Sequence, residues 1–181
     1  MKKTNFLTLL FVILSIQANA QQSQKEKNQT KADEFSEKSG TLMERQFIEV
    51  GKLKGVEIKI LKVKDLVNNT GYSALRFEYE YKSSYSSDTK ISAIDQDEID
   101  GLVKSINALK TNVLNTTRDN YTEVTFKSRT GLEAGAYYSS DKQKWTGYLQ
   151  IEKYDRNSMV FFASEDFDQL LEIIEKAKTM M

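Results

Sequence analysis

The sequence predicts an α+β protein built from two ββββα repeats. Two segments, 99–109 and 167–177, place apolar residues at i, i+3, i+4 and i+7, the spacing of one helix face, and they lie 68 residues apart. The stretches before each segment alternate apolar and polar residues, which is typical of half-buried strands. Each helix has one apolar stripe and each clear strand one apolar face. We therefore expect an antiparallel sheet with the two helices packed on one face.

The first residues, 1–20, have the pattern of a signal peptide. An apolar run over 6–16 follows two lysines, and Ala18 and Ala20 provide a small-residue cleavage signal. We expect cleavage after Ala20 and export to the periplasm or the extracellular space; a retained N-terminal anchor is the alternative. The run is too short to span a membrane, and no later segment reaches the length that a span needs.

The chain contains no cysteine and no histidine. The lack of cysteine excludes a lipoprotein anchor and any disulfide framework. The lack of histidine removes the Ser-His-Asp and Cys-His nucleophile systems and the common zinc sites. We therefore expect no metal and no cofactor. The 26 basic and 26 acidic residues give a formal net charge of zero, so no nucleic-acid partner is expected.

Residues 21–45 form a polar stretch with mixed charges. This composition favours a flexible leader, because it offers little apolar surface to bury; a solvated helix is the alternative. Residues 46–115 form the first predicted half. Its strands are expected at about 46–50, 56–63, 75–82 and 90–94.

Three local features mark this first half. In the second strand the apolar parity slips from Ile60 to Leu61, which suggests a bulge or a twist. A turn is predicted at 68–71, with Gly71 supplying any positive φ. Asp95 is expected to cap the first long helix, and Glu98 three residues later completes a capping box.

Residues 116–181 form the second predicted half, and the two halves together are expected to make one compact unit. Ser164 is expected to cap the last helix. The strands of this half are predicted at about 122–127, 132–138, 145–154 and 158–163.

Short motifs recur between the halves and indicate a duplication. Gly55-Val56-Glu57 corresponds to Gly131-Leu132-Glu133, and Thr70-Gly71-Tyr72 corresponds to Thr146-Gly147-Tyr148, both at an offset of 76. The helices match at 68, which we attribute to a shortening of the loop at 83–88. Changes of length confined to loops are typical of duplicated units. Chance similarity between two strand-rich halves is the alternative.

The acidic residues give no clear catalytic site. The group from Asp95 to Asp100 lacks the ligands of a calcium loop and is interpreted as acids that complement the dipole of a helix N-terminus. Two carboxylate pairs, Glu57 with Glu133 and Glu78 with Glu152, could serve glycoside hydrolysis, but they fall on a solvated strand face. No histidine or motif lysine accompanies the serine-rich loop at 83–88 to activate a serine.

Four tyrosines are the candidate binding residues. By strand parity, other tyrosines (Tyr79, Tyr81 and Tyr138) belong to the core. Parity places the candidates on the opposite, polar face: Tyr72, Tyr137, Tyr148 and Tyr154. A tyrosine ring offers apolar area plus a hydroxyl, which suits a protein or glycan surface. The alternative is that scattered exposed tyrosines simply favour strands.

These observations together predict an exported, soluble, non-enzymatic binding module for a protein or glycan partner, which uses the polar sheet face. A structural or oligomerising envelope protein is the first alternative. A hydrolase is the second alternative. It ranks below the other two because no catalytic motif accompanies the acidic residues.

Overall fold

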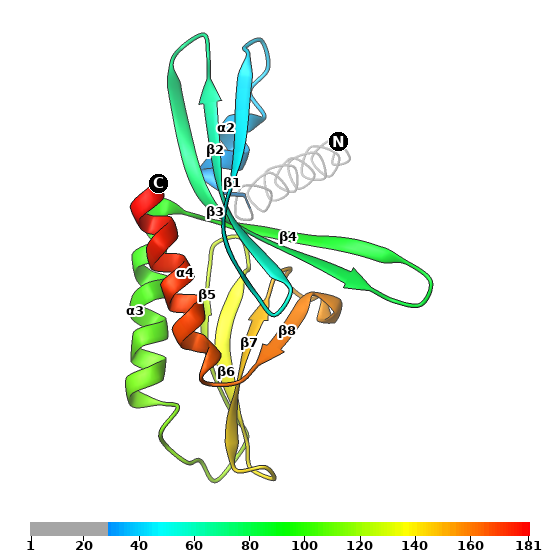
Figure 1. Cartoon of the computed structure of the whole chain (residues 1–181), viewed down its shortest axis with the longest axis vertical. Coiled ribbons are helices and arrows are strands. Elements are labelled where there is room, and N and C mark those ends of the chain that lie inside the picture. The colour runs from blue at the N-terminus through cyan, green and yellow to red at the C-terminus, as the bar shows by residue number, and fades with distance from the viewer. Residues whose placement is uncertain (1–28) are drawn as a thin grey trace, which may run out of the picture.

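The computed structural model describes residues 29–181 and has an α+β fold (Figure 1). The strands form two antiparallel sheets of four strands, each in sequential order. The first sheet contains β1 (Met43–Leu53), β2 (Val56–Asp65), β3 (Thr70–Lys82) and β4 (Ser87–Asp95). The second contains β5 (Thr122–Lys127), β6 (Glu133–Ser139), β7 (Lys144–Gln150) and β8 (Met159–Phe162). The helices of the described part are α2 (Lys31–Ser36), α3 (Gln96–Asn112) and α4 (Asp166–Met180).

The two sheets and the two long helices share one hydrophobic core. Helices α3 and α4 lie side by side (Figure 1), and α4 packs on β1 and β2 of the first sheet. Helix α3 contacts strands of both sheets. The helix residues that are buried in this core are those of the predicted apolar stripes: Ile99, Leu102, Ile106, Phe167, Leu170 and Ile174.

Helix α2 lies within the segment predicted to be a flexible leader, so that prediction is wrong for residues 31–36. Thr30 caps the helix by accepting a hydrogen bond from the backbone of Asp33, in a capping box. Ala32 and Phe35 are buried on the first sheet. They complete a second, smaller core with Leu61, Val63, Ala74 and Ala93. Two apolar residues, three positions apart, are therefore enough to dock this helix.

The parity slip in β2 has a different cause from the predicted bulge. Strand β2 pairs without interruption with both neighbours, and the register shift lies in β1 between Glu49 and Gly51. Ile60 faces the main core, whereas Leu61 faces α2. Both residues are buried because each face of β2 is covered by a different element, with no break in the pleat.

The turn between β2 and β3 also differs from the prediction. Asn69, with a φ of 52°, supplies the left-handed conformation instead of Gly71. Gly71 is needed for space, because a Cβ there would lie 2.5 Å from the carbonyl oxygen of Val63. Asp65 holds the turn by accepting hydrogen bonds from the Asn68 side chain and from Thr41, and these bonds lower its pKa.

The remaining elements lie within a few residues of their predicted positions. The main exception follows β7, where residues 151–154 form a turn instead of extending the strand. The last helix begins at Asp166, after Glu165 as its N-cap, instead of directly after Ser164. No helix within residues 29–181 combines the length and apolar character needed to cross a membrane. The predicted signal peptide lies outside the described residues.

Ion pairs tie the two halves together. Arg129, in the turn before β6, contacts Asp95 at 2.8 Å and Asp97 at 2.6 Å, at the start of α3. On the edge of β4, Lys90 contacts Asp155 of the second half at 2.7 Å. The acidic group at the start of α3 therefore makes tertiary contacts in addition to complementing the helix dipole.

Candidate functional site

The structure brings two of the four predicted tyrosines together. Tyr137 on β6 and Tyr148 on β7 occupy the outer face of the second sheet, away from the helices. Tyr72 lies on the first sheet, where its half-exposed ring packs on Phe35 of α2 with ring centroids 5.1 Å apart. Tyr154 is exposed in the turn after β7, with Lys153 over its ring. The predicted four-tyrosine patch is therefore not a single surface.

Tyr148 lies on the predicted face, but the expectation that it is exposed is wrong. Its side chain is 4% exposed. In the ladder, Tyr148 stands opposite Gly135, which stands opposite Thr125. The ring lies across Gly135, which has no side chain, and its hydroxyl forms a hydrogen bond with the hydroxyl of Thr125. Burial raises the pKa of the Tyr148 hydroxyl.

The outer face of the second sheet carries a continuous row of aromatic rings. The centroid of Tyr137 lies 6.0 Å from that of Tyr121, just before β5, and 6.0 Å from that of Phe161 on β8. Tyr121 is 61% exposed and Phe161 is 52% exposed. Phe161 stands opposite Tyr148 in the ladder. We call these four residues the aromatic stripe: Tyr121, Tyr137, Tyr148 and Phe161.

Two members of the stripe were missed by the sequence reasoning. Phe161 belongs to the run Met159–Phe162, in which no polar residue marks the outward side. Tyr121 precedes the first residue of β5, so strand parity did not assign it to a face. Only the pairing register, which aligns β8 with β7, places Phe161 beside the predicted tyrosines.

Polar side chains surround the aromatic stripe. The Tyr121 hydroxyl donates a hydrogen bond to Glu123, which raises the pKa of Tyr121 to about 12. Lys127 and Glu133 form an ion pair at 2.5 Å on the same face, and Glu133 raises the pKa of Lys127. Strand parity adds Lys144 and Thr146 to this face. Its two carboxylates and two ammonium groups leave the face without net charge.

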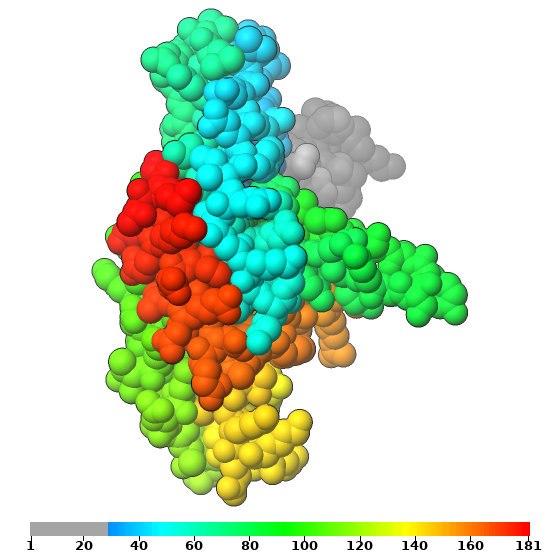
Figure 2. All heavy atoms as spheres, in the orientation of Figure 1, coloured from blue at the N-terminus to red at the C-terminus, as the bar shows by residue number. Residues whose placement is uncertain are grey.

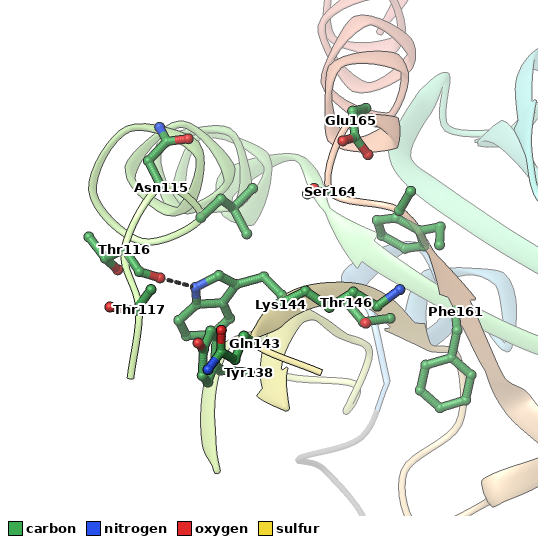
Figure 3. Close-up of a pocket in the computed structure, with 14 residues that line it drawn as sticks. Asn115, Thr116, Thr117, Tyr138, Gln143, Lys144, Thr146, Phe161, Ser164 and Glu165 are labelled. Carbon is green, nitrogen blue, oxygen red and sulfur yellow. Dashed lines mark hydrogen bonds between the residues drawn. The ribbon is translucent and has the colours of Figure 1, made fainter. Parts of the chain in front are cut away.

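A hollow of about 670 Å³ adjoins the stripe at Phe161 and Thr146 (Figure 3). Strand β8 pairs with β7 only from Gly147 onward, so the first residues of β7 have no partner on that side. Trp145, whose buried indole packs on Tyr138 of β6, lines the hollow and donates a hydrogen bond of 2.7 Å to the carbonyl oxygen of Thr116. Ser164 and Glu165 line the opposite wall. The hollow therefore extends the aromatic stripe around the end of the sheet.

The carboxylates that were considered for catalysis are held in ion pairs. Glu57 and Glu78 both contact Lys59, at 2.9 Å and 2.6 Å. Glu152 accepts a hydrogen bond from the backbone of Ile91. Within residues 29–181 no three acidic side chains converge in a way that would hold a metal ion.

Comparisons with protein families, with curated proteins and with solved structures found no match.

Proposed function

We propose that this chain is a non-enzymatic binding module that holds a neutral glycan on the aromatic stripe. The observation that supports the proposal most is the row of rings that begins at the exposed Tyr121, just before β5, and ends at the half-exposed Phe161 on β8. Flat aromatic faces accept the apolar face of a sugar ring. The surrounding carboxylates and hydroxyls match its hydroxyl groups.

The size of the stripe favours a glycan over a folded protein. An aromatic side chain has about 150–250 Å² of surface, so the exposed parts of Tyr121 and Phe161 together offer roughly 200 Å². A stable protein interface buries about 800 Å² on each partner. A short oligosaccharide needs far less area, and the hollow beside Phe161 gives it a second place to bind.

The charge of the face favours a ligand without net charge. Glu123 and Glu133 are balanced by Lys127 and Lys144, so the face itself carries no net charge. A strongly anionic polysaccharide would gain no long-range attraction from such a surface. We further propose that the chain is exported, with cleavage after Ala20, which would place it where extracellular or envelope glycans occur.

We also infer that the two ββββα halves arose by duplication. Gly55 and Gly131 hold the same turn position with φ values of 92° and 93°. In the first sheet, three residues stand opposite one another on β2, β3 and β4: Ile58, Phe77 and Ser92. In the second sheet, the matching residues on β6, β7 and β8 are Ala134, Leu149 and Val160, at offsets of 76, 72 and 68. The last offset equals that of the helices. In this alignment the shortening is divided between two connections, β6–β7 and β7–β8, and Tyr148 corresponds to Arg76 instead of Tyr72.

A second candidate function is that of a structural or oligomerising envelope protein. Within residues 29–181 no strand pairs with the N-terminal half of the edge strand β1, and this favours the role, because an open sheet edge is a template for pairing with another chain.

The test of the glycan proposal is an array of neutral oligosaccharides probed with the labelled chain. The double variant Tyr121→Ala with Phe161→Ala should lose at least tenfold in affinity for any sugar that the native chain retains, equivalent to about 1.4 kcal/mol. Tyr85→Ala removes an exposed tyrosine on the β3–β4 hairpin, away from the second sheet, and serves as the matched control. Retention of no neutral sugar by the native chain, or equal loss in the control, would contradict the proposal.

A further inference from the structure

Edge strand β1 is covered along only part of its length. Its C-terminal part lies under α4, where Lys176 donates a hydrogen bond of 3.1 Å to the carbonyl oxygen of Val50. Gln169 donates another, also of 3.1 Å, to the carbonyl oxygen of Lys52. Among residues 29–181 no strand pairs with the free side of β1. The segment 43–49 therefore presents an open edge, and β1 lies on the visible face in Figure 2.

The outer face of this open edge carries an exposed aromatic residue between opposite charges. Phe47 is 52% exposed, and the guanidinium of Arg76 lies 5.4 Å from its ring centroid. Arg45 and Glu49 are also exposed and lie two residues to either side of Phe47 on the same face. One nitrogen of the Arg45 guanidinium donates a hydrogen bond of 3.0 Å to the carbonyl oxygen of Ser36, at the end of α2, and its other N–H groups remain for a second partner. The pattern Arg–x–Phe–x–Glu is self-complementary when the strand is reversed.

We propose that two copies of this chain pair antiparallel through residues 45–49 of β1, with Phe47 on the two-fold axis. Arg45 of each copy then faces Glu49 of its partner, and the two Phe47 rings lie side by side. Opposite residues on neighbouring antiparallel strands have Cβ atoms about 4.5–5.5 Å apart, which is close enough for both ion pairs. The pairing joins the two first sheets into one continuous sheet.

Other registers that keep both outer faces on the same side place poorly matched residues directly opposite each other. Centring the pair on Arg45 brings the two Arg45 guanidinium groups together, and centring it on Glu49 brings two carboxylates together. Centring it on Gln46 places Arg45 opposite Phe47 and leaves both charges without a partner. Like charges in directly opposite positions destabilise a sheet. The charge pattern therefore selects the register centred on Phe47.

The pairing is independent of the aromatic stripe, which lies on the second sheet. The shared strip is five residues long and buries less area than a standard interface, so the dimer is expected to be weak. Sedimentation should therefore be followed from about 10 µM to 1 mM, the range that populates complexes of micromolar to millimolar Kd.

A cysteine crosslink tests the register directly, because the chain has no cysteine of its own. In Phe47→Cys the two thiols of a dimer face each other within disulfide reach, so mild oxidation should give a covalent dimer. Tyr85→Cys, at the fully exposed tip of the β3–β4 hairpin, measures the rate of chance collision. Crosslinking of Phe47→Cys at least tenfold faster than Tyr85→Cys supports the proposal; equal rates overturn it.

Charge exchange tests the same register without cysteine. Arg45→Glu places two carboxylates opposite each other twice in the dimer, so it should shift the chain to the monomer. The double variant Arg45→Glu with Glu49→Arg restores opposite charges and should restore the dimer. Since these side chains are exposed, thermal melts should confirm that each variant is folded. A monomeric native chain at 1 mM, or a dimer that Arg45→Glu leaves intact, overturns the proposal.

Discussion

Truncation of Tyr148 to alanine should destabilise the protein strongly, although the residue lies on the outer face of a sheet. Its ring is 4% exposed. Burial of about 150–250 Å² at 25 cal/mol per Å² corresponds to about 4–6 kcal/mol as an upper bound. Correction for a compact unfolded chain leaves about 3–4 kcal/mol, similar to other aromatic-to-alanine changes in cores.

The expected loss is measurable by calorimetry or by denaturant unfolding. For a chain of this size, 1 kcal/mol changes Tm by about 2–4 °C, so Tyr148→Ala should lower Tm by roughly 6–16 °C. Tyr148→Phe removes only the hydrogen bond with Thr125 and should cost about 1 kcal/mol. Tyr85→Ala, which removes a ring that is 99% exposed, should cost less than about 0.5 kcal/mol. If Tyr148→Ala costs no more than Tyr85→Ala, the ring is not packed across Gly135 and the reasoning fails.

Three further predictions concern the packing and the ion pairs. Phe35→Ala should undock α2, which hydrogen exchange would detect as faster exchange at 31–36 with little change in the long helices; unchanged exchange there would count against a docked helix. Ile106→Ala should cost about 2–5 kcal/mol in denaturant melts and Lys104→Ala less than about 0.5, and similar costs would remove the amphipathic assignment of α3. Hydrogen bonds from Arg129 and Lys31 hold the pKa of Asp97 below its ordinary value of 3.8. The stability that this carboxylate contributes is therefore present above pH 3.8 and lost at lower pH, and Arg129→Gln should make the acid dependence shallower; an unchanged slope would exclude this cluster as its source.

The local patterns of the sequence predicted the α+β class and its antiparallel strands because those patterns follow backbone periodicity. From Leu75 to Lys82, strand β3 alternates apolar and charged residues, and Leu75 and Phe77 are buried as this parity predicts; Ala74, of the opposite parity, is buried under α2. The predicted stripe of α3 matches its buried residues, whereas in α4 Ile173 is buried in addition to the predicted Phe167, Leu170, Ile174 and Ala177, and Leu171 is only partly buried. In such elements one side faces the core and the other faces solvent. The alternation of apolar and polar residue types in the sequence indicates which side is which.

The errors arose where one residue depends on another that is distant in sequence. The buried Leu61 and Val63 require α2, whose two anchoring residues are too few to mark a helix within a polar segment. Tyr148 is buried because Gly135, on a different strand, leaves space for its ring. Gly71 pairs with Lys64 as a residue of β3, and Asn69 adopts the left-handed conformation of the turn. Each of these contacts becomes visible only when the strand register is known.

The same limit affected the candidate site. Parity assigned Tyr137 and Tyr148 to the face that carries the aromatic stripe, but it could not decide which of the two sheets Tyr72 joins. It also gave no reason to select Phe161 over Phe162, since both lie in an uninterrupted apolar run. The register of β7 with β8 decides this point, because it places Phe161 opposite Tyr148 and leaves Phe162 facing Phe167 of α4.

The central claim, that the aromatic stripe binds a neutral glycan, is tested most directly by NMR of the aromatic rings. The chain, labelled with ¹³C in its aromatic residues, would be titrated with a pool of neutral cello-, chito- and malto-oligosaccharides. We predict saturable shifts in the signals of Tyr121, Tyr137 and Phe161, while the signal of Tyr85 stays in place. Equal shifts at every exposed ring, or no shift at the stripe at millimolar sugar, would contradict the claim.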